Sequence, residues 1–187
     1  VESEMVPALQ QELKAKNEIE DAYIDMLMSP AAAPNDPDYD KQWPLHAHDR
    51  HPAGSYAKVE EAWDLGYLGD SQNIAIVDSG ITEHPDLDSK VLPGYDMITN
   101  DRTAGDTSPG RDDDPRDTGD GYGIGFCPND PNNSRNSSWH GTHVAGIAAA
   151  ATNNGAGVAG TAPNAGLLPV RAMGKCGGYA SDIADSV

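Results

Sequence analysis

The segment Asn73-Ile74-Ala75-Ile76-Val77-Asp78-Ser79-Gly80 decides the fold class of this chain. Four consecutive apolar residues lead into an aspartate, and a serine and a glycine then end the run. A short run of this kind predicts a strand covered on both faces, as in a parallel sheet. Because ligands of open α/β sheets bind at the carboxyl ends of the strands, Asp78 is expected at a functional edge. An aspartate in this position has one other ordinary role, which is to cap the turn that follows.

Further elements extend the pattern on both sides of this strand. Residues 166–173 form a second apolar run, although Pro169 argues against a central strand. Helices are predicted at 58–65 and, from small residues, at 140–151, and a third begins at Asp182 with the preceding serine as its cap. Strands that alternate with helices predict an α/β fold with a mainly parallel sheet flanked by helices.

Two regions depart from this alternation. Residues 1–33 contain a predicted helix at 6–16 and a predicted strand at 19–26, and they end in a small-residue segment that is open to cleavage. Residues 99–138 are rich in Asp, Gly, Pro, Asn and Ser, which predicts a long loop. Loops of this length in compact domains are usually either functional or disordered.

The charge of the chain excludes several classes of partner. Asp and Glu outnumber Lys and Arg by 30 to 12, for a net charge of −18. This balance argues against binding to nucleic acid or to an anionic membrane surface. The longest apolar run, at 144–151, contains a glycine and is too short to cross a bilayer. The excess of carboxylates is consistent with solubility through repulsion and also with carboxylates that gather around a cation.

Three motifs resemble those of one family, the subtilisin-like serine peptidases or subtilases (peptidase family S8). Ile76-Val77-Asp78-Ser79-Gly80-Ile81, followed by His84-Pro85-Asp86-Leu87, is similar to the family's aspartate motif. Ser138-Trp139-His140-Gly141-Thr142-His143-Val144-Ala145-Gly146 is similar to its histidine motif. Gly157-Val158-Ala159-Gly160-Thr161-Ala162-Pro163 follows in the same order, and the resemblance covers residues 34–187.

The resemblance implies an Asp-His-Ser triad that hydrolyses peptide bonds in proteins. A serine hydroxyl is a weak nucleophile that needs an adjacent base, and His140 would take its proton. Asp78 would hold the imidazole in the correct tautomer and stabilise its charged form. Neither Gly141-Thr142 nor Gly160-Thr161 is followed by serine, so the nucleophile is expected beyond Val187. We therefore expect these residues alone to hydrolyse no peptide bonds.

The resemblance also implies a domain organisation. Residues 34–187 would be the N-terminal portion of a three-layer α/β/α catalytic domain, incomplete in this chain. Residues 1–33 would be the C-terminal part of a propeptide that acts as intramolecular chaperone and inhibitor. The protein would be secreted, extracellular and monomeric. The alternative is a catalytically inactive, truncated subtilase that serves as a binding module or as a calcium-dependent structural module.

Two further features near the histidine motif have a functional and a plain interpretation. Gly177-Gly178-Tyr179 follows the second strand, where the family pairs an extended edge with the substrate backbone, and such β-addition needs little side-chain recognition. The plain interpretation is a turn. His143 lies three residues after His140, but no third ligand has suitable spacing for a metal site, and the family's second histidine is structural.

The acidic segment at 111–120 predicts calcium. It contains five carboxylates in ten residues, which would repel one another unless a hard cation ordered them. It lacks EF-hand spacing but resembles the calcium loops of secreted bacterial subtilases, with the candidate ligands Asp112, Asp114, Asp117 and Asp120. A solvated, disordered loop is the alternative. By resemblance alone, a second calcium site is expected at Asp36, Asp86 and Asn154.

The chain has two cysteines, Cys127 and Cys176, at a separation of 49 residues. Two cysteines are consistent with one disulfide in an oxidising compartment. Such a bond would stabilise the fold by ~4 kcal/mol on the chain-entropy estimate. A catalytic thiol is not expected, because neither cysteine lies in a reactive motif.

Overall fold

The computed structural model describes Glu12, Ala15 and residues 33–46, 54–108 and 110–187. The chain divides into two compact units, Val1–Pro30 and Ala31–Val187. Apart from Glu12 and Ala15, the helix and strand expected before residue 33 lie outside the described residues. The helices and strands with assigned bounds lie in the second unit.

The sheet of this unit has three parallel strands in the order β1-β3-β2. They are β1 (Asn73–Asp78), β2 (Tyr95–Asp96) and β3 (Gly166–Arg171). In the register of β1 and β3, Asp78 lies opposite Arg171, so the carboxyl ends of both strands meet at one edge. The predicted α/β fold with a mainly parallel sheet flanked by helices is confirmed.

Pro169 lies inside the central strand β3, which the sequence argued against. The backbone N–H of Leu167, two residues earlier, donates to Lys90 O on the β2 side of β3. Because backbone groups alternate along a strand, the nitrogen of Pro169 faces the same side. The ladder is interrupted there, since β2 pairs only with Val170 and Arg171. A proline is tolerated because no neighbouring carbonyl needs its missing N–H.

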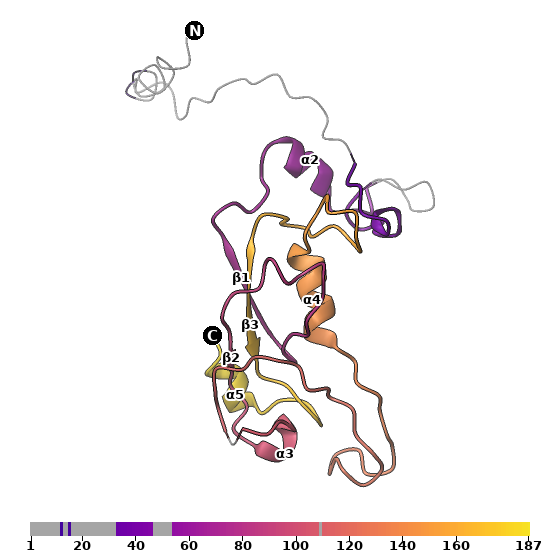
Figure 1. The fold of residues 1–187 in the computed structure, drawn as a ribbon, viewed down its shortest axis with the longest axis vertical. Coiled ribbons are helices and arrows are strands. Elements are labelled where there is room, and N and C mark those ends of the chain that lie inside the picture. The colour runs from indigo at the N-terminus through magenta and orange to yellow at the C-terminus, as the bar shows by residue number, and fades with distance from the viewer. Residues whose placement is uncertain (1–11, 13–14, 16–32, 47–53, 109) are drawn as a thin grey trace. The chain divides into compact units, whose positions relative to one another are not determined.

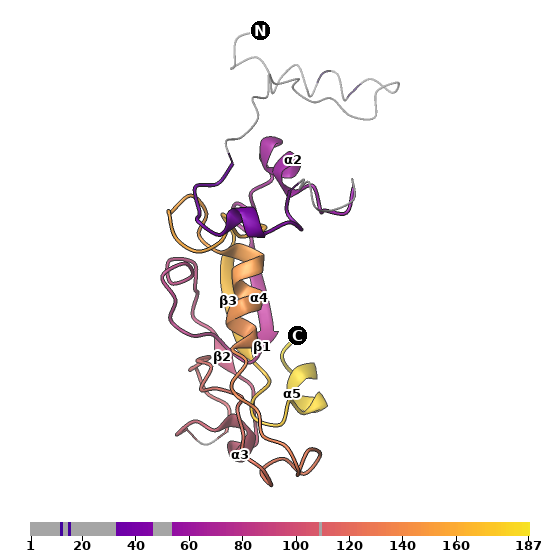
Figure 2. The ribbon, with the colours of Figure 1, turned by 90° about the vertical axis from the view of Figure 1, so that its right-hand side faces the viewer.

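Helix α4 (His140–Ala149) covers one face of the sheet and lies beside β1 and β3 in both ribbon views (Figures 1 and 2). Its alanines Ala145 and Ala149 are fully buried against the strands. The core under the helix comprises Ile76, Ile81, Leu87, Ala145, Ala149, Ala150, Ala165 and Leu167. The small side chains predicted for this helix therefore let it pack closely on the sheet.

The remaining elements are short. They are η2 (Tyr39–Lys41), α2 (Val59–Asp64), α3 (Asp101–Ala104) and α5 (Ala180–Ala184). Helix α2 matches the predicted helix at 58–65. Helix α5 begins before Ser181, and its N-cap is the extended Tyr179, so the expected serine cap is wrong. The region at 99–138 is a long connection, as expected, but it contains α3.

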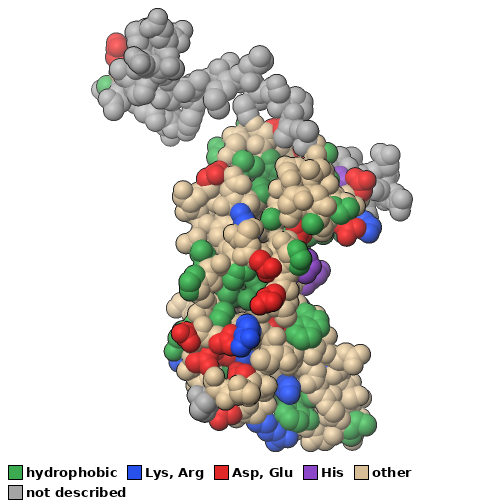
Figure 3. All heavy atoms as spheres, in the orientation of Figure 1, with side chains coloured by type: hydrophobic (Ala, Val, Ile, Leu, Met, Phe, Trp, Pro, Cys, Tyr) green, Lys and Arg blue, Asp and Glu red, His purple; other side chains and the backbone are tan. Residues whose placement is uncertain are grey.

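The surface of the unit reflects its composition. Figure 3 shows acidic side chains grouped on one face with few basic ones among them. Among the described residues, no helix is both long and apolar enough to span a bilayer.

Candidate active site

The end of β1 and the first residue of α4 bring Asp78 and His140 together. The Nδ1 atom of His140 lies 2.8 Å from both Oδ1 and Oδ2 of Asp78. Asp78 is buried, whereas the His140 side chain is 60% exposed. A buried carboxylate that engages Nδ1 fixes the orientation of the ring and leaves Nε2 as the nitrogen available to a reacting group.

Backbone contacts hold both residues of this pair in place. The carbonyl of Asp78 accepts hydrogen bonds from Ala172 N at 2.8 Å and from Met173 N at 3.1 Å, which ties β1 to the chain after β3. A Cβ atom on Gly141 would lie 2.2 Å from Gly80 O. Glycine at 141 is therefore required for the close approach of α4 to the end of β1.

A pocket of about 620 Å³ opens beside the Asp78–His140 pair. Its walls come from the end of β1, from the long connection at 99–138 and from the segment after β3. Besides the pair, its lining includes Asp120, Tyr122, Asp130, Arg135, Met173 and Gly177. The exposed imidazole of His140 is part of the lining of this pocket.

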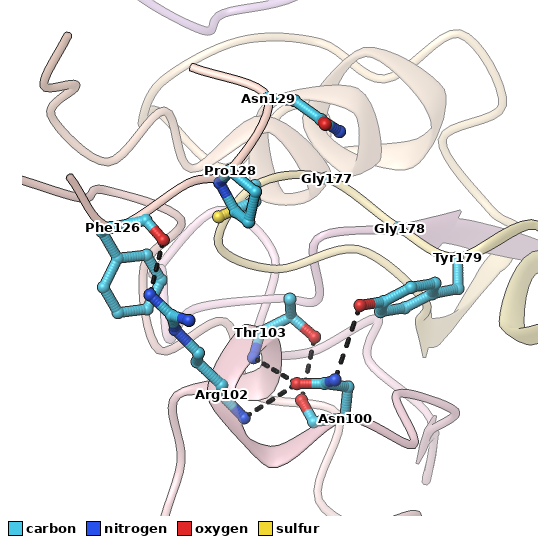
Figure 4. Close-up of a pocket in the computed structure, with 10 residues that line it drawn as sticks. Asn100, Arg102, Thr103, Phe126, Pro128, Asn129, Gly177, Gly178 and Tyr179 are labelled. Carbon is cyan, nitrogen blue, oxygen red and sulfur yellow. Dashed lines mark hydrogen bonds between the residues drawn. The ribbon is translucent and has the colours of Figure 1, made fainter. Parts of the chain in front are cut away.

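The segment Gly177-Gly178-Tyr179 borders this pocket and a second one of about 410 Å³. Gly174 and Gly177 exchange two backbone hydrogen bonds of 3.1 Å, so a tight turn precedes the exposed Gly178 and Tyr179. Figure 4 shows the tyrosine hydroxyl directed toward the Asn100 side chain, at 3.5 Å. The turn at 174–177 is thus followed by Tyr179, whose backbone is extended.

The predicted disulfide between Cys127 and Cys176 is present in the structure. It ties the long connection to the residue just before Gly177. The neighbouring Phe126 is held by Arg102, whose guanidinium lies 4.6 Å from the ring centre and donates to Phe126 O at 2.6 Å (Figure 4). The disulfide and this contact together fix the wall between the two pockets.

The four candidate ligands of the acidic segment do not share one site. Asp112, Asp114 and Asp117 line a pocket of about 340 Å³, but Asp120 instead accepts hydrogen bonds from Ser138 N at 2.6 Å and Ser138 Oγ at 2.8 Å. The guanidinium of Arg116 donates to both oxygens of Asp114 and lowers the pKa of that carboxyl. The described part of the chain holds no group of three His, Cys, Asp or Glu side chains that could bind a metal ion.

The second candidate calcium set lies around the loop that follows α4. Asp86 accepts from Asn154 Nδ2 at 2.7 Å and from Val158 N at 2.9 Å. Asp36 accepts from Asn153 N at 2.8 Å through Oδ2. Its Oδ1 is buried and has no hydrogen-bond partner among the described residues. This loop therefore gathers the three predicted residues and presents one unused buried oxygen.

Two buried polar interactions of this region were not expected from the sequence. Arg171 is fully buried at the end of β3 and pairs with Asp96 and Asp106. Ser79 and Asp117 form a buried hydrogen bond of 2.7 Å behind Asp78. The sequence contained a signal for the Arg171 pairs, because an arginine inside an apolar strand needs a buried partner. His143, expected to be structural, lies exposed on α4.

Comparisons with known proteins identify the family of this chain. Residues 69–187 match the Subtilase family. An extracellular basic protease from Dichelobacter nodosus is 45% identical over 174 residues, which cover 91% of this chain and 28% of that protein. The chain therefore spans less than a third of this curated relative.

Solved structures give the same result. A protease from Pseudoalteromonas arctica superposes with a TM-score of 0.74 at 48% identity, over 83% of this chain and 43% of that one. A serine protease from Aeromonas sobria, solved in complex with a chaperone, superposes with a TM-score of 0.52 at 27% identity, over 80% and 23%. This chain belongs to the subtilase family.

Proposed function

We propose that the full-length protein containing this chain is a secreted serine endopeptidase that hydrolyses peptide bonds in proteins. The observation that carries the proposal is the contact of His140 Nδ1 with both oxygens of the buried Asp78, at 2.8 Å. In this role His140 is the general base toward a serine hydroxyl and then the acid toward the leaving amine. Asp78 orients the ring and stabilises its positive charge.

The exposed backbone of Gly178 and Tyr179 is the proposed binding edge for substrate. It borders the pocket of the Asp78–His140 pair through Gly177. An extended peptide that adds to this edge makes main-chain hydrogen bonds and places its scissile bond beside the imidazole. Side-chain preference then depends on the pockets on either side of the edge.

Secretion and a propeptide partner are part of the same proposal. The Dichelobacter nodosus relative is named as extracellular, and the Cys127–Cys176 disulfide suits an oxidising compartment. The Aeromonas sobria protease was solved with a chaperone, which supports a chaperone-like partner here. We assign that role to residues 1–33 as the end of a propeptide that precedes the catalytic portion at 34–187.

A structural calcium ion is part of the proposal, at the second of its two expected sites. The buried, unpartnered Oδ1 of Asp36 is the kind of oxygen that a hard cation takes, and Asp86 and Asn154 lie around the same loop. In the acidic segment, Asp114 is engaged by Arg116, Asp117 by Ser79, and Asp120 lies apart. The proposal places calcium at the Asp36 site, where it would stabilise the loop after α4.

The test compares the full-length protein with two variants, His140→Ala and Asp78→Asn. We expect wild type to cleave casein and to react with a serine-directed phosphonate. Each variant should lose activity by about 10⁴-fold or more, because removal of one triad member disables the unit. The 187-residue chain alone should be inactive. Full activity of His140→Ala, or no phosphonate reaction in wild type, would contradict the proposal and favour an inactive binding module.

A further inference from the structure

Ser79 connects the two residues of the candidate catalytic pair. Its backbone N–H donates to Asp78 Oδ1 at 2.7 Å. Its hydroxyl oxygen accepts a hydrogen bond from Gly141 N, the residue after His140, at 3.0 Å. Ser79 is thus hydrogen-bonded both to Asp78 and to the first turn of α4. The residue is only 5% exposed.

The hydroxyl of Ser79 can donate one hydrogen bond, and Asp117 accepts it. Ser79 Oγ donates to Asp117 Oδ2 at 2.7 Å, and Asp117 Oδ1 accepts from Gly119 N at 2.7 Å. Both oxygens of this carboxylate therefore have protein donors. Asp117 is 8% exposed, and its backbone N–H is held by Ile81 O at 2.9 Å. The carboxylate has a fixed position directly behind β1.

We propose that Asp117, acting through Ser79, is a positioning residue for the Asp78–His140 pair. The inference rests on the proposed function, since that function makes His140 the base. It gives Asp117 a role other than that of a calcium ligand, since both of its oxygens accept hydrogen bonds from protein donors. The charged acceptor gives a stronger hydrogen bond than a neutral one, and it selects the rotamer in which Ser79 Oγ faces Gly141 N.

The position of His140 depends on that rotamer. Trp139, just before it, has a positive φ of 53°, which is unfavourable for a residue with a side chain and has to be imposed by neighbouring contacts. Gly141, just after it, is held by Ser79 Oγ. If Ser79 is free to rotate, Gly141 N loses its acceptor in a buried place, and the first turn of α4 relaxes. The imidazole then moves relative to the carboxylate of Asp78.

The test observes the His140 Nδ1 proton by NMR in the 187-residue chain, which needs no nucleophile. A ring proton held by a carboxylate gives a low-field resonance that exchanges slowly with water. We expect Ser79→Ala and Asp117→Ala to shift this resonance and to make its exchange about tenfold faster, the change expected from losing one buried hydrogen bond. Asp117→Asn should give a smaller change, because its amide oxygen still accepts from Ser79.

Thr118→Val is the matched control. Thr118 follows Asp117 and makes two hydrogen bonds, to Ala104 O and with Arg171, that do not reach Ser79. The Thr118→Val variant should lower the stability of the chain without shifting the His140 resonance. An unchanged resonance in a folded Ser79→Ala or Asp117→Ala chain would overturn the proposal, and so would an equal shift in Thr118→Val. If the alanine variants do not fold, the near-isosteric Asp117→Asn is measured instead. An unchanged His140 resonance in that variant would overturn the proposal.

A second readout separates this inference from the proposed function. In the full-length protein, Asp117→Asn and Ser79→Ala should lower kcat about tenfold and leave KM nearly unchanged, since geometry at the reacting atoms is affected and the binding edge is not. If wild type is inactive, the proposed function fails and the NMR result still tests the inference. If wild type is active and both variants keep its kcat, the inference alone fails.

Discussion

The carboxylates that lie near the two ends of helix α4 are used in different ways. At its start, Asp78, Asp117 and Asp120 have both oxygens bonded to protein donors. Beyond its far end, Asp36 keeps a buried oxygen without a partner among the described residues. At the first end the carboxylates position protein groups. At the second end one oxygen remains for a ligand.

The number of carboxylates in a segment does not by itself say which of their oxygens remain without a donor. In the segment at 111–120, Asp114 is engaged by Arg116, Asp117 by Ser79, and Asp120 lies apart, while the nearby Asp106 keeps a buried Oδ1 without a partner among the described residues. The loop after α4 brings Asp36, Asp86 and Asn154 together from distant parts of the sequence, and Asp36 Oδ1 is a buried oxygen without a partner among the described residues. What matters is whether a buried acceptor remains unsatisfied after the backbone and side-chain donors are counted.

The largest effect in this set of predictions concerns the disulfide at the catalytic end. Replacing Cys127 and Cys176 by serine should lower the free energy of unfolding by about 4 kcal/mol, because the bond closes a loop of 49 residues. Urea denaturation measures this loss. Amide exchange should become faster at 174–179 and stay unchanged at 151–158. Equal acceleration at both places would show that the two ends of α4 are not independent.

Removal of calcium should affect the far end. At a calcium concentration about 100 times its Kd, a chelator is expected to lower the free energy of unfolding by about 3 kcal/mol. Asp36→Asn should abolish this chelator effect, since it removes the carboxylate with the unused oxygen. Asp112→Asn is the matched control and should retain it. The assignment is wrong if the chelator has no effect on wild type, or if only Asp112→Asn abolishes it.

The smallest effect concerns acid, and it belongs to the catalytic end. Burial alone would raise the pKa of Asp182, but the hydrogen bond from Thr99 N and the ion pair with Arg111 outweigh burial and lower it. A carboxyl whose folded pKa is depressed stabilises the fold above its unfolded value near 4. That stability is lost as the pH falls through the folded value.

Asp182→Asn should therefore cost about 2 kcal/mol at pH 7 and progressively less below about pH 4. Denaturation curves between pH 7 and pH 2 measure the slope. The exposed Asp185, which pairs with the same Arg111, supplies the control. Asp185→Asn should change the curve little. A pH dependence of Asp182→Asn identical to that of wild type would contradict the assignment of acid sensitivity to this carboxyl.

Local patterns in the sequence account for much of the fold. The apolar run before Asp78 became β1, the small-residue segment after Trp139 became α4, and the helix near 58–65 became α2. Each of these depends on residues that are neighbours in the chain, so periodicity alone reveals it. Pro169 argued wrongly against a central strand. Whether a proline is compatible with a strand depends on whether a neighbouring strand needs an N–H donor at that position.

The sequence by itself determined the family, the strand and helix that bear Asp78 and His140, and the pair of cysteines. Only the tertiary structure decided what each acidic side chain does. Asp117 and Asp120 are three residues apart, yet one faces Ser79 and the other faces Ser138. Asp36 is left with an unused oxygen for the same reason. Hydrogen-bond partners come from segments that meet only when the chain folds, and no spacing within one segment records which donors arrive.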